Sequence, residues 1–198
     1  MLRTSAETIG FVVFMIAVVV WRAWETYRKQ GSVRGVTSML WSFYAMVALT
    51  ILIFGGTVLE FFLVKRTFHP SLSLLGILLF ILANLLRLRA TRTLGNFWSL
   101  HVEIRERHQF VRGGPYAFVR HPAYTSFVME HIAVPLVGNA WWSLAATVLL
   151  YIPMILLRLN KEESALVGKF GDAYRAYQRE VGALAPKPMA FRRRVVPR

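Results

Sequence analysis

The chain contains no cysteine and only 10 acidic residues among its 198. The lack of cysteine excludes disulfide bonds and metal sites that are built from thiolates. Because 24 lysines and arginines oppose these few acids, the formal charge is +14, which suits an anionic partner such as nucleic acid or anionic lipid. The sequence also holds neither HExxH nor a GxGxxG that follows a strand. A zinc-hydrolase helix and a Rossmann nucleotide fold are therefore unsupported.

Hydrophobic residues decide between the two anionic partners, because they make up 56% of the chain and are gathered into long runs. Soluble domains are usually about 45–50% apolar. Runs of this length are typical of helices that cross a lipid bilayer. The sequence therefore predicts an all-α, polytopic membrane bundle in one domain (1–198), with lipid and not nucleic acid as its partner. Five runs are predicted spans: 9–24, 39–64, 72–88, 123–137 and 141–157.

Basic residues fall almost entirely on one side of a chain with five spans. Of the 24 lysines and arginines, only Arg3, Lys65 and Arg66 lie on the opposite side. Cytoplasmic loops carry the excess of positive charge in membrane proteins. We therefore expect the N-terminus outside, and the C-terminus and the loop after the third span in the cytoplasm. The basic tail at 187–198 is typical of an anchor on a lipid surface.

The richest polar segment, HQFVRGGPYAFVRHPAY, runs from His108 to Tyr124 between the third and fourth spans. Its paired glycines before Pro115 predict a tight turn. Proline is favoured in a first helical turn and drives the preceding residue to extended geometry, so His121 is expected directly before the fourth helix. Backbone N–H groups at such a helix start favour an anion. An ordinary helix start with interfacial aromatic residues is the alternative for this motif alone.

A second polar segment begins at Arg158, immediately after the apolar run YIPMILL. Arg158 and Glu162 are four residues apart and share one helix face, which Leu166, Phe170 and Tyr174 are expected to continue. An ordinary ion pair above an apolar stripe would account for this pattern. Two observations favour a functional interpretation. Arginine before glutamate is the poorer order for a helix pair, and a charge at the membrane boundary is costly without a partner.

Other polar residues lie within the predicted spans. Glu60 and Glu130 carry charge inside apolar segments, so both are functional candidates, although Glu60 could simply cap an interface. Asn84 is expected to form a hydrogen bond to another helix. The five histidines show no metal-ligand spacing, so no metal site is predicted.

Taken together, the two polar segments resemble the isoprenylcysteine carboxyl methyltransferase family of membrane enzymes. The resemblance covers about Gly95 to Val181 and rests on H-x-x-V-x-x-G-P-Y-x-x-V-R-H-P-x-Y, R-x-x-x-E-E-x-x-L and F-G-x-x-Y-x-x-Y, in that order. It implies that 95–124 and 158–181 hold S-adenosylmethionine without a Rossmann sheet, and that S-adenosylhomocysteine is the product. It also implies a lipophilic, isoprenylcysteine-like acceptor whose carboxylate is methylated at the membrane–cytoplasm interface.

The resemblance implies roles for individual residues as well. Arg158 would orient the carboxylate of the substrate, and Glu162 would act at the cofactor. A further cofactor contact shortly before the first motif would fall on His101 or Val102. The cofactor contacts that follow from motif position are His108, Gln109, Phe110, Val111, Tyr116, His121, Pro122, Ala123, Tyr124 and Glu162.

Other functions stay open at this point. The RHPxY motif alone also resembles phospholipid methyltransferases and sterol reductases, so a lipid-amine N-methyltransferase or an NADPH-dependent membrane reductase would fit it. A non-catalytic protein whose basic face binds anionic lipid would fit the charge. Carboxyl methylation accounts best for Arg158, because a carboxylate is already ionised at neutral pH and needs only to be oriented.

Overall fold

The structure is a computed structural model, and it describes residues 4–28, 37–38, 40–95, 102–103 and 111–187. Two short strands, β1 (Thr37–Ser38) and β2 (Val102–Glu103), pair antiparallel. All other regular elements in the described ranges are helical. They are α1 (Ser5–Arg28), α2 (Leu40–Leu63), α3 (Pro70–Leu94), η2 (Gly114–Ala117), α4 (Pro122–Gly138), α5 (Trp141–Ala146), η3 (Thr147–Tyr151), α6 (Ile152–Phe170) and α7 (Asp172–Glu180).

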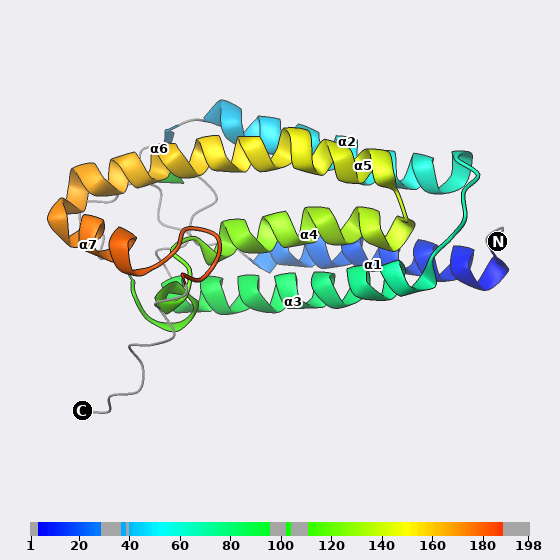
Figure 1. The fold of residues 1–198 in the computed structure, drawn as a ribbon, viewed down its shortest axis with the longest axis horizontal. Coiled ribbons are helices and arrows are strands. Elements are labelled where there is room, and N and C mark those ends of the chain that lie inside the picture. Colours follow the sequence, from blue (N-terminus) through cyan, green and yellow to red (C-terminus); the bar gives the residue numbers. More distant parts are fainter. Residues whose placement is uncertain (1–3, 29–36, 39, 96–101, 104–110, 188–198) are drawn as a thin grey trace.

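The long helices lie side by side and run along one axis of the molecule (Figure 1). Four of the described helical stretches are long and apolar enough to cross a membrane: Ser5–Glu25, Leu40–Leu63, Pro70–Leu94 and the continuous helix Trp141–Phe170. The predicted helical membrane bundle is therefore confirmed. A fifth helix along the same axis, α4, has 17 residues. At about 1.5 Å per residue it is shorter than the hydrocarbon core of a bilayer, which is about 30 Å thick.

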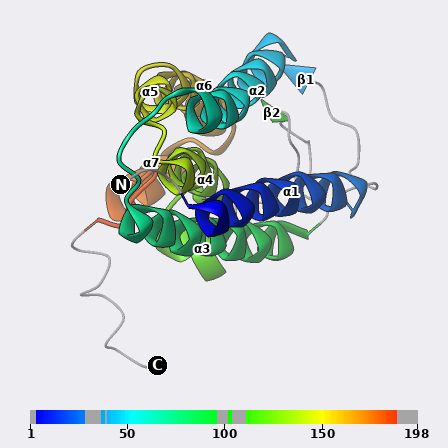
Figure 2. The ribbon, with the colours of Figure 1, turned by 90° about the vertical axis from the view of Figure 1, so that its right-hand side faces the viewer.

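Helix α4 lies at the centre of the bundle, between α1 and α3 on one side and α2 and α6 on the other (Figure 2). Most of its residues are buried, whereas α1, α2 and α3 expose many large apolar side chains. Gly76 of α3 permits the close approach to α4, because a Cβ there would lie 2.8 Å from the carbonyl oxygen of Ala133. The apolar faces of the outer helices thus face lipid, while α4 lies in the protein interior.

The end of the bundle near the start of α1 is closed by polar contacts. The Glu60 carboxylate accepts hydrogen bonds from the backbone N–H groups of Trp142 and Ser143, both at 3.0 Å. It also pairs with Arg66 at 2.9 Å. These contacts satisfy the first turn of α5, so Glu60 acts as a cap at this end. Asn139, with φ of 51°, ends α4 and accepts a hydrogen bond from the His69 backbone.

At the opposite end, the last long helix extends beyond its predicted boundary and then breaks. It runs from α5 to Phe170, and Gly171 interrupts it with φ of 55°. The expected helix face therefore continues through Leu166 to Phe170, but its extension to Tyr174 is wrong. Glycine adopts this left-handed conformation without steric cost, so the chain turns and begins α7. Tyr174 then packs back against Leu166 and Phe170 as part of a separate apolar cluster.

The two ends differ in what they contain. The start of α1 and the α2–α3 connection lie at one end, whereas η2, the start of α4 and α7 lie at the other (Figure 1). This arrangement agrees with the one-sided distribution of basic residues. The assignment of the η2 and α7 end to the cytoplasm stays a prediction.

Candidate active site

Tyr124, Arg158 and Glu162 meet where the first turn of α4 lies against α6. Nε of Arg158 donates a hydrogen bond to the Tyr124 hydroxyl at 2.9 Å. That hydroxyl donates in turn to Oε2 of Glu162 at 2.6 Å. The helix spacing predicted from the sequence does place Arg158 and Glu162 one turn apart, and a phenol from another helix bridges them.

Arg158 is deeply buried, with only 3% of its surface exposed. Its Nη1 donates a hydrogen bond to Oγ of Ser42 at 3.0 Å. Ser42 lies in α2, 116 positions earlier in the sequence. Ser42 itself is fully buried. Sequence reasoning missed this residue, because a serine at the start of an apolar helix carries no motif and its partner is fixed only by tertiary packing.

His121 lies directly before α4 as its N-cap residue, as the proline at the first helical position predicts. Its φ of −125° and ψ of 64° lie outside the extended region, so the expected extended geometry is wrong, and its side chain forms no capping bond. Its backbone N–H donates to the Ala183 carbonyl at 3.0 Å, which anchors the segment before α4 to the chain after α7. Its Nε2 lies 3.1 Å from Glu163 Oε1 and its Nδ1 lies 4.0 Å from Glu162 Oε1. The imidazole ring stacks on Tyr124, with the ring centroids 5.6 Å apart.

Glu163 also holds the segment before α4 through Arg120, the residue that precedes His121. Arg120 forms an ion pair with Glu163 at 2.7 Å and donates a hydrogen bond to the Gln178 carbonyl at 3.1 Å. It also donates to the Val181 carbonyl. The neighbouring glutamates therefore have different surroundings: Glu163 binds the basic residues before α4, whereas Glu162 binds the Tyr124 hydroxyl.

Tyr116, in the short helix η2, is buried beside this group. Gly114 begins η2 with φ of 57°, and a Cβ there would lie 2.9 Å from Oγ1 of Thr93, so glycine is required at this turn. The Tyr177 hydroxyl of α7 donates to the Tyr116 carbonyl. Burial raises the pKa of the Tyr116 phenol, and the nearby Glu162 charge raises it further, so this phenol stays protonated at neutral pH.

The structure thus brings five predicted site residues to one end of the bundle: Tyr116, His121, Tyr124, Arg158 and Glu162. Pro122 is buried and Ala123 half-buried in the first turn of α4, and Val111 is half-buried just before η2. His101, His108, Gln109 and Phe110 lie outside the described residues. Val102 is described only through the backbone of β2.

The chemistry of these groups suits two reactants of opposite charge. The Glu162 side chain is 30% exposed and lies beside the stacked rings of His121 and Tyr124. A carboxylate beside aromatic rings attracts a cation. The buried guanidinium of Arg158, on the other side of the Tyr124 hydroxyl, attracts an anion such as a carboxylate. This donor set fits the sulfonium and ammonium charges of S-adenosylmethionine on one side and a carboxylate acceptor on the other.

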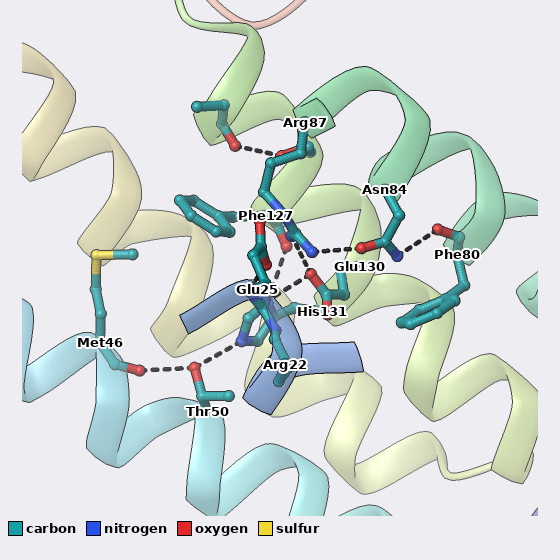
Figure 3. Close-up of polar contacts among 12 residues, drawn as sticks. Arg22, Glu25, Met46, Thr50, Phe80, Asn84, Arg87, Phe127, Glu130 and His131 are labelled. Atoms are coloured by element: carbon teal, nitrogen blue, oxygen red, sulfur yellow. Dashed lines mark hydrogen bonds and ion pairs between the residues drawn. The ribbon is translucent and has the colours of Figure 1, made fainter. Parts of the chain in front are cut away.

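A second polar cluster is buried deeper in the bundle, where four charged side chains alternate in a closed ring (Figure 3). Arg22 pairs with Glu25 at 3.3 Å and with Glu130 at 2.6 Å. Arg87 pairs with Glu25 at 2.8 Å and also with Glu130. The ring joins α1, α3 and α4 with no net charge. Arg87, in the last turn of the predicted span 72–88, is 1% exposed and lies in the protein interior.

The residues around the ring extend this polar layer to the remaining long helices. The His131 ring stacks on the ring of Tyr151 in η3, with the centroids 3.5 Å apart. Its Nε2 lies 2.9 Å from the Thr50 hydroxyl of α2. The expectation that Asn84 bonds to another helix is wrong, because its described partners, the Phe80 carbonyl and Arg87, both lie on α3. Glu130, a functional candidate from the sequence, is a member of the ring. Removing one partner from such a buried network leaves an uncompensated charge in the interior and destabilises the fold.

Comparison with known proteins adds the family. The sequence profile of the isoprenylcysteine carboxyl methyltransferase family matches residues 75–168, a stretch that includes most of α3, all of α4 and most of α6. The profile match, the relatives and a solved structure together support membership of this family. The matched stretch contains Tyr124, Arg158 and Glu162, whereas α1 and α2 lie outside it.

Individual relatives agree with this membership. The chain is 28% identical over 141 residues to the protein-S-isoprenylcysteine O-methyltransferase of Xenopus laevis, covering 61% of this chain and 44% of that protein. It is 41% identical over 73 residues to the methanethiol S-methyltransferase of Pseudomonas deceptionensis, covering 36% of this chain and 26% of that protein.

A solved structure of the family has a similar fold. The structure of a eukaryotic intramembrane Ras methyltransferase, an isoprenylcysteine carboxyl methyltransferase, matches with a TM-score of 0.57 and 27% identity. The match covers 76% of this chain and 54% of the other. The chain therefore spans about half, or less, of the length of these methyltransferases. The apolar helices and the shared fold make it an integral, multi-pass membrane protein.

Proposed function

We propose that this protein transfers a methyl group from S-adenosylmethionine to the carboxylate of a lipophilic, isoprenylcysteine-like acceptor at the membrane–cytoplasm interface. The observation that carries the proposal is the hydrogen-bonded series from Arg158 through Tyr124 to Glu162. It presents a buried cation and a partly exposed anion on either side of one hydroxyl. Membership of the family and the similarity to protein-S-isoprenylcysteine O-methyltransferases support the reaction class.

Glu162 and the rings of Tyr116, His121 and Tyr124 would hold the cofactor. When bound, S-adenosylmethionine supplies an electrophilic methyl group on a positively charged sulfur. The partly exposed Glu162 carboxylate would attract its cationic groups, and the Tyr124 hydroxyl holds that carboxylate in place. Further cofactor contacts would come from Val111, Pro122 and Ala123 and from the preceding motif residues His108, Gln109 and Phe110.

Arg158 would bind and orient the carboxylate of the acceptor. A carboxylate is ionised at neutral pH, so the chain needs no general base, and the Tyr124 proton stays on its oxygen. A C–O bond forms at the acceptor while the bond from methyl carbon to sulfur breaks. The negative charge of the acceptor and the positive charge of the sulfur are both lost in this step, so a site that excludes water favours it.

A thiol acceptor is the second candidate. It is favoured by the 41% identity with a methanethiol S-methyltransferase, which is concentrated in a short stretch of 73 residues. A thiol must first lose its proton before it attacks a methyl group. A buried guanidinium would stabilise the resulting thiolate, so Arg158 is compatible with both acceptors, and only an assay separates them.

The experiment is a transfer assay with labelled S-adenosylmethionine and the full chain in lipid nanodiscs. The acceptors are a panel of lipophilic carboxylates, thiols and amines, with NADPH oxidation followed in parallel. We expect label on the carboxylates, released by alkali as expected for an ester. Label on thiols or amines alone, or NADPH oxidation without transfer, contradicts the proposal.

A further inference from the structure

Arg158 is held from two directions by hydroxyl groups on different helices. Its Nε donates to the Tyr124 hydroxyl of α4 at 2.9 Å, and its Nη1 donates to the Ser42 hydroxyl of α2 at 3.0 Å. Both bonds have a charged donor, so each is stronger than a bond between neutral groups. Ser42 and Arg158 are both buried, which removes the competition of water for these donors.

Two anchored atoms fix a guanidinium more completely than one. The group is planar and rigid, and its N–H bonds point in fixed directions within that plane. A bond at Nε alone leaves the plane able to tilt about that contact. The second bond, at Nη1, sets the orientation of the plane and with it the direction in which the cation faces an acceptor.

The position of Ser42 is itself well fixed by α2. Ile53 of the same helix is part of the apolar cluster that contains Tyr124 and Leu159, and Met46 and Leu49 pack against that cluster. The helix therefore docks beside the site along several turns. Ser42 lies in its first turn, outside the stretch matched by the family profile, 75–168.

We propose that Ser42 is a positioning residue for the acceptor carboxylate and acts through Arg158. The inference rests on the proposed carboxyl methylation, and it assigns to α2, outside the matched stretch, a part in holding the acceptor. Ser42 bonds directly to the Arg158 guanidinium, the group that would bind the acceptor carboxylate. The effect of changing Ser42 should therefore fall on the acceptor and not on the cofactor.

The test compares four variants of the full chain in lipid nanodiscs. Ser42→Ala removes the hydroxyl, and Ser42→Thr retains it. Thr57→Val is the matched control, because Thr57 is a buried hydroxyl residue on the same helix whose described bond goes to the Ile53 carbonyl at 2.8 Å. Ser42→Cys, with a weaker acceptor atom of similar size, is measured as well, so that a folding failure of Ser42→Ala does not remove the test.

For a lipophilic carboxylate, kcat/KM is expected to fall about tenfold in Ser42→Ala, the loss expected for one hydrogen bond to a charged group. Ser42→Cys should fall in the same direction. Ser42→Thr and Thr57→Val should stay within about twofold of wild type, since neither removes this bond. The Kd for S-adenosylmethionine, measured by calorimetry, should be unchanged in all four. Wild-type kcat/KM in Ser42→Ala and Ser42→Cys, or an equal loss in Thr57→Val, overturns the inference and leaves the proposed function standing.

A second measurement does not depend on activity. The nitrogen NMR signal of Arg158 Nε, assigned by its loss in Arg158→Lys, reports on the orientation and bonding of the guanidinium. If the wild type methylates no carboxylate, the proposed function fails and this signal decides the positioning role. A shift in Ser42→Ala but not in Thr57→Val supports the role of Ser42. An unchanged signal in Ser42→Ala overturns it.

Discussion

Nε of Arg158 lies 2.9 Å from the hydroxyl of Tyr124, although the two residues are 34 positions apart and on different helices. Because the same hydroxyl donates to Glu162, one phenol fixes both the cation that would orient the acceptor and the anion that would hold the cofactor. The site therefore depends on the docking of α4 against α6 as much as on either motif alone.

Removing the Tyr124 hydroxyl should impair both reactants at once. In Tyr124→Phe we expect the KM values for acceptor and S-adenosylmethionine each to rise roughly tenfold, because Arg158 and Glu162 each lose a charged hydrogen bond. The ring and its stacking on His121 remain, so the fold should persist. Tyr44→Phe, an exposed tyrosine of α2, is the matched control. Wild-type values for both reactants in Tyr124→Phe would contradict this account.

Keeping the charge of Arg158 without its shape should affect the acceptor alone. A lysine is a compact ammonium and cannot donate from two fixed positions to Tyr124 and Ser42 while presenting a planar edge. In Arg158→Lys we expect kcat/KM for the carboxylate to fall roughly a hundredfold, the usual loss when one oriented donor is removed from a reaction site. Calorimetry should show unchanged S-adenosylmethionine binding. Loss of cofactor binding with a normal acceptor KM would reverse the assigned roles.

Neutralising Glu162 should weaken the binding of the cofactor and leave that of the acceptor unchanged. In Glu162→Gln we expect the affinity for S-adenosylmethionine to fall roughly tenfold, because an amide attracts the cationic cofactor less than a carboxylate does. The acceptor KM should change little. Asp172→Asn, at an exposed carboxylate in α7, is the control for a simple change of net charge. Equal losses in the two variants would count against a specific contact at Glu162.

The buried ring should matter for stability and not for the choice of reactants. In Glu130→Gln, Arg22 and Arg87 lose their shared charged partner, which should lower the free energy of unfolding by about 3–5 kcal/mol. A lower unfolding temperature in nanodiscs would show this loss. The S-adenosylmethionine affinity of the folded protein should be unchanged. A normal unfolding temperature together with an altered acceptor KM would instead place the ring on the path of the acceptor.

Local sequence patterns predicted the parts of the site that are close in sequence. Proline geometry placed His121 before the fourth helix, and helical spacing placed Arg158 and Glu162 on one face. The family motifs indicate that these two segments belong to one site. The bridge through Tyr124 needed the structure, because the relation of α4 to α6 is tertiary.

The sequence could not predict, for a different reason, the partners of Ser42 or those of the ring formed by Arg22, Glu25, Arg87 and Glu130. A helix that is apolar on all sides carries almost no periodic signal, so its buried face cannot be identified from the pattern alone. Basic residues near the ends of such runs also look like loop or interface cations. Arg22 and Arg87 were therefore assigned to the basic side of the membrane, although their partners lie inside the bundle.

The most direct test of the proposed carboxyl methylation uses one pair of acceptors with the wild-type chain. A small prenylated cysteine analogue is compared with its amide, which has the same apolar part but no carboxylate. We predict that labelled methyl from S-adenosylmethionine appears only on the acid, as an ester that alkali hydrolyses. Equal labelling of the amide, or no labelling of the acid while S-adenosylmethionine is bound, would contradict the account.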